Sequence, residues 1–99
     1  MHDPPTTVIG LLHVELHIPL CDSLKQKRSV LRPCIQTLRT KLNVAVAETG
    51  DQDIWRSAIL AVATVSGDKT MVEQTLDKAL GLIGRRPNLE VVDSEVEML

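Results

Sequence analysis

The stretch TVIGLLHVELHIP, residues 7–19, decides the fold. Its side chains alternate between an apolar set and a polar set, and the polar set contains His13, Glu15 and His17. The apolar set, with one glycine in it, consists of Val8, Gly10, Leu12, Val14, Leu16 and Ile18. A period of two residues is typical of a β-strand with one buried face. Pro19 then ends the strand, because proline has no N–H for the ladder.

A long helix is predicted to follow, with Ser23 or Asp22 as its N-cap. Apolar residues fall on one line of this helix, as expected for a face that packs on a core. They are Leu24, Leu31, Ile35, Leu38 and Leu42. Pro33 lies on the opposite side, where water can satisfy the carbonyl of Ser29, so we expect one kinked helix and not two helices.

The rest of the chain predicts a hairpin, a second helix and a final strand. Residues 43–48 and 54–65 are rich in apolar and β-branched residues, and residues 49–53 have the composition of a turn. The second helix is predicted after Asp68 or Thr70, with Glu73 in a capping box and Gly84 at its end. Residues 89–98 alternate again, with Val92, Val96 and Met98 on one face and Asp93, Glu95 and Glu97 on the other.

The predicted order is therefore β-α-β-β-α-β. Two right-handed β-α-β units with a hairpin between them give a ferredoxin-like α+β fold, a four-stranded antiparallel sheet with two helices on one face. The first and third strands are expected in the centre, and the other face of the sheet is expected to be open. Residues 7–99 form one predicted domain, and residues 1–6 form a flexible tail.

Composition argues for a cytoplasmic protein. No run reaches the ~20 apolar residues that a membrane span needs, and the first residues lack the features of a signal peptide. Cys21 and Cys34 are the only cysteines, which fits two reduced thiols better than a disulfide framework.

Three blocks of sequence resemble the YlxP-like family of small bacterial proteins, also called domain of unknown function 503. The blocks are SLKQKRSVL at 23–31, NVAVAE at 43–48 and DIWRSAILAVATVS at 53–66. The resemblance implies a ferredoxin-like fold and no established activity, and it supplies no catalytic residues. It also implies an association with translation, because genes of this family are often found near those for ribosome-binding factor A and translation initiation factor two.

Basic residues are concentrated on the first predicted helix. Residues 23–47 hold six basic side chains and no acidic one, whereas residues 88–99 hold four acids and no base. Four of the basic residues flank the apolar line: Lys25, Arg28, Arg32 and Arg39. They are either a surface for RNA phosphates or a solvated face offset by acids on neighbouring elements. The net charge of −2 and the 1% aromatic content argue against a typical surface that binds single-stranded nucleic acid by stacking its bases on aromatic side chains.

The open sheet face offers a second candidate surface. The row His13, Glu15 and His17 should lie beside Asp93 and Glu95 of the last strand. The two histidines are roughly 13 Å apart at ~3.3 Å per residue, too far to share a metal ion. The strand at 54–65 is apolar on both faces, with Ile59 and Val65 on one and Leu60 and Val62 on the other, and such strands are usually covered on both. A homodimer would cover the open face.

Enzymatic motifs are not found. The loop at 19–22 has no glycine for a phosphate cradle, and no P-loop, nucleophile-elbow or zinc-protease motif occurs. We expect no enzyme, metal or cofactor. The leading hypothesis is a non-catalytic accessory protein that contacts ribosomal RNA or a translation factor through the first helix. The alternative is a homo-oligomeric interaction protein that uses the open sheet.

Overall fold

The computed structural model describes residues 5–99, and it has the predicted order of elements. The elements are β1 (Val8–His17), α1 (Leu24–Lys41), β2 (Ala45–Gly50), β3 (Ser57–Ser66), α2 (Lys69–Gly84) and β4 (Glu90–Met98). Residues 1–4 of the predicted tail lie outside the described residues.

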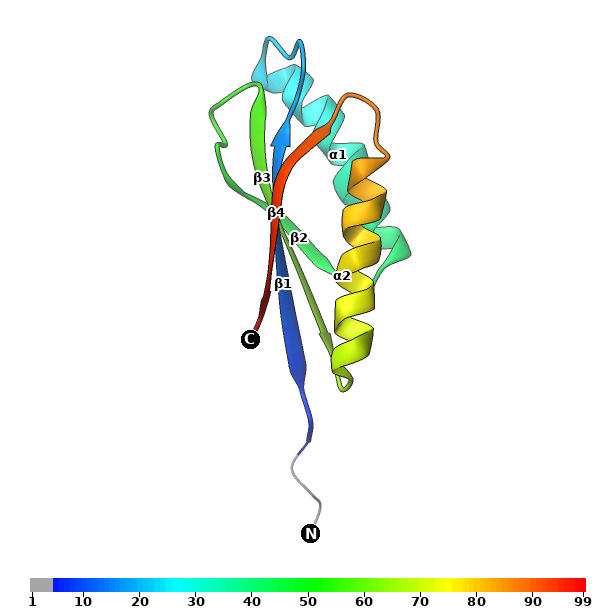
Figure 1. Cartoon of the computed structure of the whole chain (residues 1–99). Coiled ribbons are helices and arrows are strands. Elements are labelled where there is room, and N and C mark those ends of the chain that lie inside the picture. The colour runs from blue at the N-terminus through cyan, green and yellow to red at the C-terminus, as the bar shows by residue number, and fades with distance from the viewer. Residues whose placement is uncertain (1–4) are drawn as a thin grey trace.

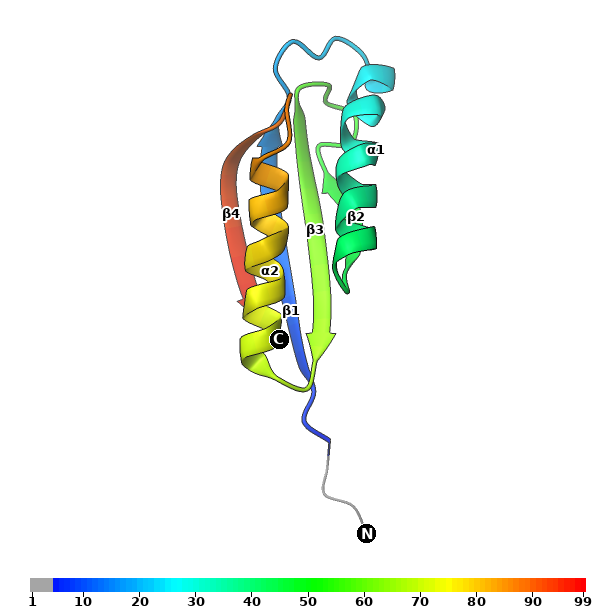
Figure 2. The same cartoon turned by 90° about the vertical axis from the view of Figure 1, so that its right-hand side faces the viewer.

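One antiparallel sheet has the strand order β2-β3-β1-β4, so the predicted topology is confirmed. Figure 1 views this sheet nearly along its edge and shows both helices on the same side of it. Figure 2 shows α1 beside β2 and α2 in front of β1 and β4. The fold is the predicted ferredoxin-like α+β arrangement, with one sheet face left open.

The alternation of β1 determines where the core lies. Leu12, Val14, Leu16 and Ile18 are all buried beneath the helices. Leu60 and Val62 of β3 point to the same side and are also buried. Each of these leucines contributes on the order of 2 kcal/mol through the water it excludes. The helix-facing side of the sheet is therefore the single apolar core that holds the layers together.

Helix α1 begins as predicted, because Ser23 is the N-cap and its hydroxyl accepts a hydrogen bond from Gln26 N at 3.0 Å. The helix continues through Pro33, which is exposed. Its buried side differs from the predicted line: Leu24, Ile35 and Leu42 are only partly buried. The fully buried residues are Lys27, Leu31, Cys34 and Leu38. The helix is thus rotated toward the side of Lys27 and Cys34.

Helix α2 is capped by Asp68, whose carboxylate accepts a hydrogen bond from Thr70 N at 3.0 Å. The predicted choice between Asp68 and Thr70 is resolved in favour of Asp68. Gly10 allows α2 to approach β1 closely, because a Cβ at this position would overlap Val72 Cγ1 and lie 2.9 Å from Leu76 Cδ1.

The predicted bounds of the hairpin are wrong by one to three residues. β2 starts at Ala45 and includes Gly50, where pairing with Ile59 continues past a bulge. β3 starts at Ser57, so Ile54 and Trp55 belong to the connection and not to the strand. The reason is a hydrogen-bond network around Lys27, described below.

Strand β4 contains a bulge that takes Val92 out of the ladder. Glu15 pairs with Asp93, but the next residue of β1, Leu16, pairs with Val91. Val96 and Met98 remain on the helix side, as predicted, whereas Val92 does not share their place in the register. Neither helix in the described part of the chain has the length and apolar character needed to cross a bilayer.

Candidate functional site

The basic residues predicted on the first helix are exposed on α1. In residues 5–99, no carboxylate lies within 4.0 Å of any of their charged groups. The four residues are Lys25, Arg28, Arg32 and Arg39. The structure therefore provides no ionic neutralisation for them, although acids on neighbouring elements were one of the predicted alternatives.

Lys27 differs from the other basic residues of α1 because it is 2% exposed. Its ammonium lies 2.7 Å from Glu48 Oε2 and donates to the carbonyl oxygens of Asp51 at 2.6 Å and Ile54 at 2.8 Å. Two of the three N–H donors of the ammonium thus have carbonyl acceptors, and its contact with Glu48 is an ion pair. Lys27 consequently joins α1 to the end of β2 and to the β2–β3 loop. The sequence pattern of the helix did not predict this role.

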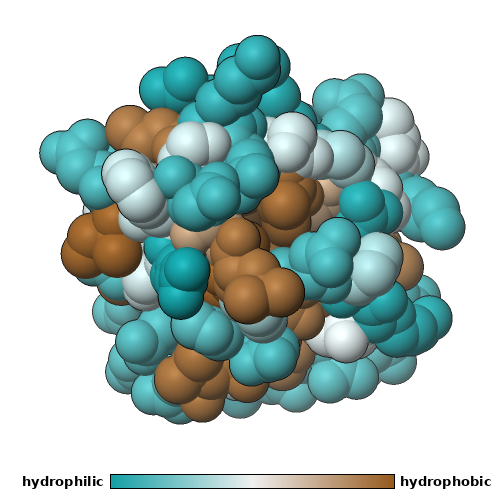
Figure 3. All heavy atoms as spheres, turned by 90° about the horizontal axis from the view of Figure 1, so that it is seen from above, coloured by the Kyte–Doolittle hydropathy of each residue, from teal (hydrophilic) through white to brown (hydrophobic). Residues whose placement is uncertain are grey.

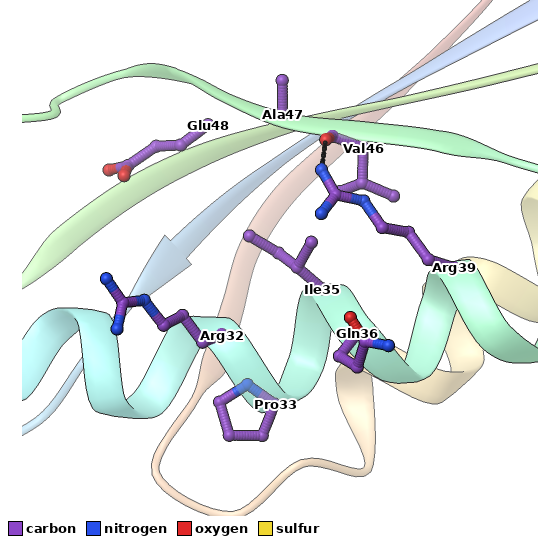
Figure 4. Close-up of a pocket in the computed structure, with 8 residues that line it drawn as sticks. All are labelled: Arg32, Pro33, Ile35, Gln36, Arg39, Val46, Ala47 and Glu48. Carbon is purple, nitrogen blue, oxygen red and sulfur yellow. Dashed lines mark hydrogen bonds between the residues drawn. The ribbon is translucent and has the colours of Figure 1, made fainter.

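A groove of about 550 Å³ runs between α1 and the free edge of β2. Figure 4 shows Arg32 and Arg39 reaching from the helix toward the strand, with Ile35 at the base between them. Glu48 also lines the groove, but its carboxylate is paired with Lys27. The charges left in the groove are therefore the two arginines.

Arg39 has a structural role in addition to its charge. Its Nη2 donates to the carbonyl oxygen of Val46 at 2.8 Å (Figure 4). Val46 belongs to the edge strand, and unpaired edge groups promote pairing with another chain. Arg39 thus occupies an edge acceptor of β2, while the remaining N–H groups of its guanidinium stay available.

The predicted row on the open face is assembled by the register of β1 and β4. His13 pairs with Glu95, Glu15 pairs with Asp93, and His17 is opposite Glu90. A shallow hollow of about 300 Å³ lies over His13, Glu15 and Asp93. His17 Nδ1 lies 3.0 Å from the carbonyl oxygen of Arg56, so Nδ1 is the protonated nitrogen.

This row does not form a metal site in the described residues. No three side chains of the types His, Cys, Asp and Glu come together there in a way that could hold a metal ion. The row is instead the boundary between an acidic edge, formed by β4, and an apolar half of the open face.

The apolar half of the open face covers β2 and β3 and part of β1. The pairing Ala45–Ala63 and Ala47–Ala61 places small residues across the two strands. Ile9 and Val65 are opposite each other and are 41% and 49% exposed. A hollow of about 500 Å³ lies over Ile9, Ala45, Ala63 and Val65. The sequence did not decide which face of this strand meets the helices. The structure shows that Ile59 and Val65 lie on the face that the helices leave uncovered.

Both cysteines are buried free thiols. Cys21 Sγ donates to the carbonyl oxygen of Ser23 at 3.3 Å. Burial raises the pKa of the Cys34 thiol above its ordinary value of 9.0, and the nearby Arg86 guanidinium offsets part of this effect. The Cys34 thiol therefore has neither the lowered pKa nor the exposure of a reactive cysteine, and the Cys21 thiol is also buried.

The end of the molecule formed by the β1–α1 and β2–β3 loops carries exposed apolar side chains. Figure 3 views this end and shows apolar groups interrupting a polar surface. Leu20, Ile54 and Trp55 are all exposed. Ile18 N donates to the carbonyl oxygen of Arg56 at 2.9 Å, so the two loops leave the sheet side by side.

Comparison with protein families gives one match that covers most of the chain. The family described as "Protein of unknown function (DUF503)" matches residues 9–96. The uncharacterized protein YlxP of Bacillus subtilis (strain 168) is 34% identical over 83 residues, which cover 84% of this chain and 90% of that protein.

Two solved structures have a similar fold. The de novo designed protein Foldit4 has a TM-score of 0.56 at 15% identity, with 94% of this chain and 96% of that chain covered. A C-terminal segment of the alpha subunit of aIF2 from Pyrococcus abyssi has a TM-score of 0.52 at 14% identity, with 98% of this chain and 51% of that chain covered. At such low identity these similarities concern the fold alone.

Proposed function

This chain belongs to the DUF503 family of proteins of unknown function, and we propose that it is a non-catalytic cytoplasmic protein that binds RNA phosphates through α1. The observation that carries the proposal is the separation of charge across the sheet. Lys25, Arg28, Arg32 and Arg39 project from α1 beside the edge strand β2. The acids of the last strand lie on β4, which is the opposite edge.

The ion pair of Lys27 sharpens this separation. Glu48 is the acid that lines the α1–β2 groove, and its carboxylate is already paired with a buried ammonium. The exposed cations of α1 therefore repel one another, and in residues 5–99 none of them forms a salt bridge with a carboxylate. Phosphates compensate such charges well, and guanidinium groups bind them in a bidentate manner.

Salt-dependent RNA binding tests the proposal. Changing Arg28 and Arg32 together to glutamine removes two cations from the α1 surface and leaves neutral polar side chains in their place. We expect weaker binding to RNA of any sequence, and a slope of log affinity against log salt that flattens by roughly 0.7 for each lost single-strand phosphate contact.

The matched control changes two exposed cations of α2, Lys69 and Lys78, to glutamine. It alters net charge by the same amount, so it should leave the salt slope nearly unchanged. Equal loss in both double variants would mean that α1 is not the binding surface. Absence of any salt-dependent RNA binding by the wild-type protein would refute the proposal.

The apolar half of the open face supports a second candidate, a homodimer. Two copies that meet through β2 and β3 would cover Ile9, Ala61 and Val65, while the acidic β4 edges would stay apart. Like charges that face each other are unfavourable, which favours this offset arrangement over one with β4 on β4. Alanines permit the two sheets to approach closely.

Sedimentation of a charged variant tests the homodimer. Ala61 lies between Ala47 and His13 in the register, at the centre of the face, so Ala61→Lys should dissociate the dimer. Gln74→Lys, on the exposed side of α2, is the control and should not. A wild-type protein that sediments as a monomer at micromolar concentration would reject this candidate.

A further inference from the structure

Trp55 is the only aromatic residue of the chain, and it is 49% exposed. Tryptophan is highly buried on average in folded proteins. Here it lies in the connection between β2 and β3, at the end of the molecule where Leu20 is also exposed. Packing in the core therefore does not explain why a residue as large as tryptophan occupies this position.

The loop that carries Trp55 is held firmly. Lys27 Nζ donates to the carbonyl oxygens on both sides of the turn, those of Asp51 and Ile54. Ser57 Oγ donates to Asp51 Oδ2 at 2.7 Å, and Arg56 Nε donates to the carbonyl oxygen of Cys21 at 2.9 Å. The backbone of such a loop is already in place before a ligand arrives, which lowers the entropic cost of binding.

The α1–β2 groove leads toward this loop. Helix α1 and strand β2 run in opposite directions, so Arg39 contacts Val46, whereas Lys27, three turns earlier on the helix, contacts Asp51 and Ile54. Arg32 lies between these two levels, and Arg28 is one turn closer to the loop than Arg32. A line of arginines on α1 thus leads toward the loop that carries the exposed Trp55.

We propose that Trp55 stacks on an unpaired nucleobase of an RNA whose adjoining phosphates are held by Arg28 and Arg32. This inference rests on the proposed RNA-binding function and makes it specific for single-stranded segments, because bases inside a duplex have no free face. Base–aromatic stacking tolerates every base, so one ring adds affinity without strong sequence preference.

Fluorescence tests the stacking directly, since the chain has one tryptophan and no tyrosine. A short single-stranded RNA should quench the emission of Trp55 as it binds. Inorganic polyphosphate should occupy the same cations without quenching, and a blunt RNA duplex should quench little. Trp55→Ala should weaken binding of the single strand about tenfold or more and leave the affinity for polyphosphate unchanged.

Two further variants control for the loop itself. Ile54→Ala removes a neighbouring exposed apolar side chain and should bind the single strand as the wild type does. Trp55→Phe keeps a stacking ring and should retain most of the affinity, which decides the matter if Trp55→Ala fails to fold. Salt-dependent RNA binding with neither quenching nor an effect of Trp55→Ala would overturn the stacking and leave the proposed function standing. No salt-dependent RNA binding at all would overturn the proposed function, and the stacking with it.

Discussion

Lys27 Nζ lies 2.7 Å from Glu48 Oε2, and this ion pair joins the first helix to the edge strand of the sheet. The ammonium is almost completely buried, whereas the carboxylate side chain is 24% exposed. Because two carbonyl oxygens of the β2–β3 loop share the same ammonium, one side chain determines the position of three elements.

Replacing Lys27 by methionine should cost about 3 kcal/mol of unfolding free energy. The change leaves Glu48 without its cationic partner and two carbonyl oxygens without their donor, and loss of one partner of a buried pair is strongly destabilising. Urea denaturation would measure it, with the exposed Lys25→Met as the control that should change stability by less than about 0.5 kcal/mol. Equal stability of both variants would mean that the contact contributes nothing.

Gly10→Ala should destabilise the protein by about 1–3 kcal/mol, the range for overpacked cores. The added Cβ would collide with Val72 and crowd Leu76 on α2. Gly84→Ala is the matched control, because no atom of the described residues, apart from its chain neighbours and the backbone of its own helix, lies within 4 Å of a Cβ at that position. It should be neutral or slightly stabilising, since alanine favours a helix over glycine. A Gly10→Ala variant with wild-type thermal stability would contradict this close packing.

Leu38→Ala should cost about 2–5 kcal/mol, as buried leucine truncations do. Leu38 lies on the side of α1 that faces the sheet and is 0% exposed, whereas Leu20 lies in a loop and is 83% exposed. Leu20→Ala should therefore be nearly neutral in the same chemical denaturation. A loss below about 1 kcal/mol for Leu38→Ala would place that residue outside the core.

The Cys34 thiol predicts a pH dependence in alkaline solution. Burial raises its pKa in the folded state above 9.0, so the unfolded chain loses this proton at lower pH than the folded chain. Stability should be unaffected by this group below about pH 9 and should fall as the pH rises toward the raised pKa. The fall is at most about 1.4 kcal/mol per pH unit.

Comparing wild type with Cys34→Ala between about pH 8 and 10.5 isolates this contribution. The wild type should lose stability more steeply with pH, and the alanine variant should lack that extra slope. Parallel profiles would show that the buried thiol does not titrate differently in the folded and unfolded states.

The fold could be predicted because its main signals are local and agree with one another. The alternation of β1, the cap at Ser23 and the turn residues around Gly67 each determine one element. The bounds of the hairpin could not be predicted from the same signals. Ile54 and Trp55 are typical strand residues, but the carbonyl oxygen of Ile54 is bound by an ammonium from another element.

The candidate site was predictable only in part. Arg28 and Arg32 are exposed, as their angular position on the helix indicates. Lys27 lies one turn before Leu31 and close to the apolar line of the helix. This position indicates burial, but a lysine is normally expected to be exposed because of its charge. Its partners Glu48 and Asp51 are more than twenty positions away, and no periodicity within α1 indicates them.

The central place of β1 has a consequence for how the chain folds during its synthesis. β1 pairs with β3 on one side and with β4 on the other, and Gly10 is opposite Met98. The β2–β3 hairpin joins neighbouring segments and can close early, because short loops lose little entropy. The β1–β4 ladder joins segments that are far apart in the chain, and such pairings slow folding. A nascent chain therefore keeps one edge of β1 unpaired, and open to contact with other chains, until the ribosome has made residues 90–98.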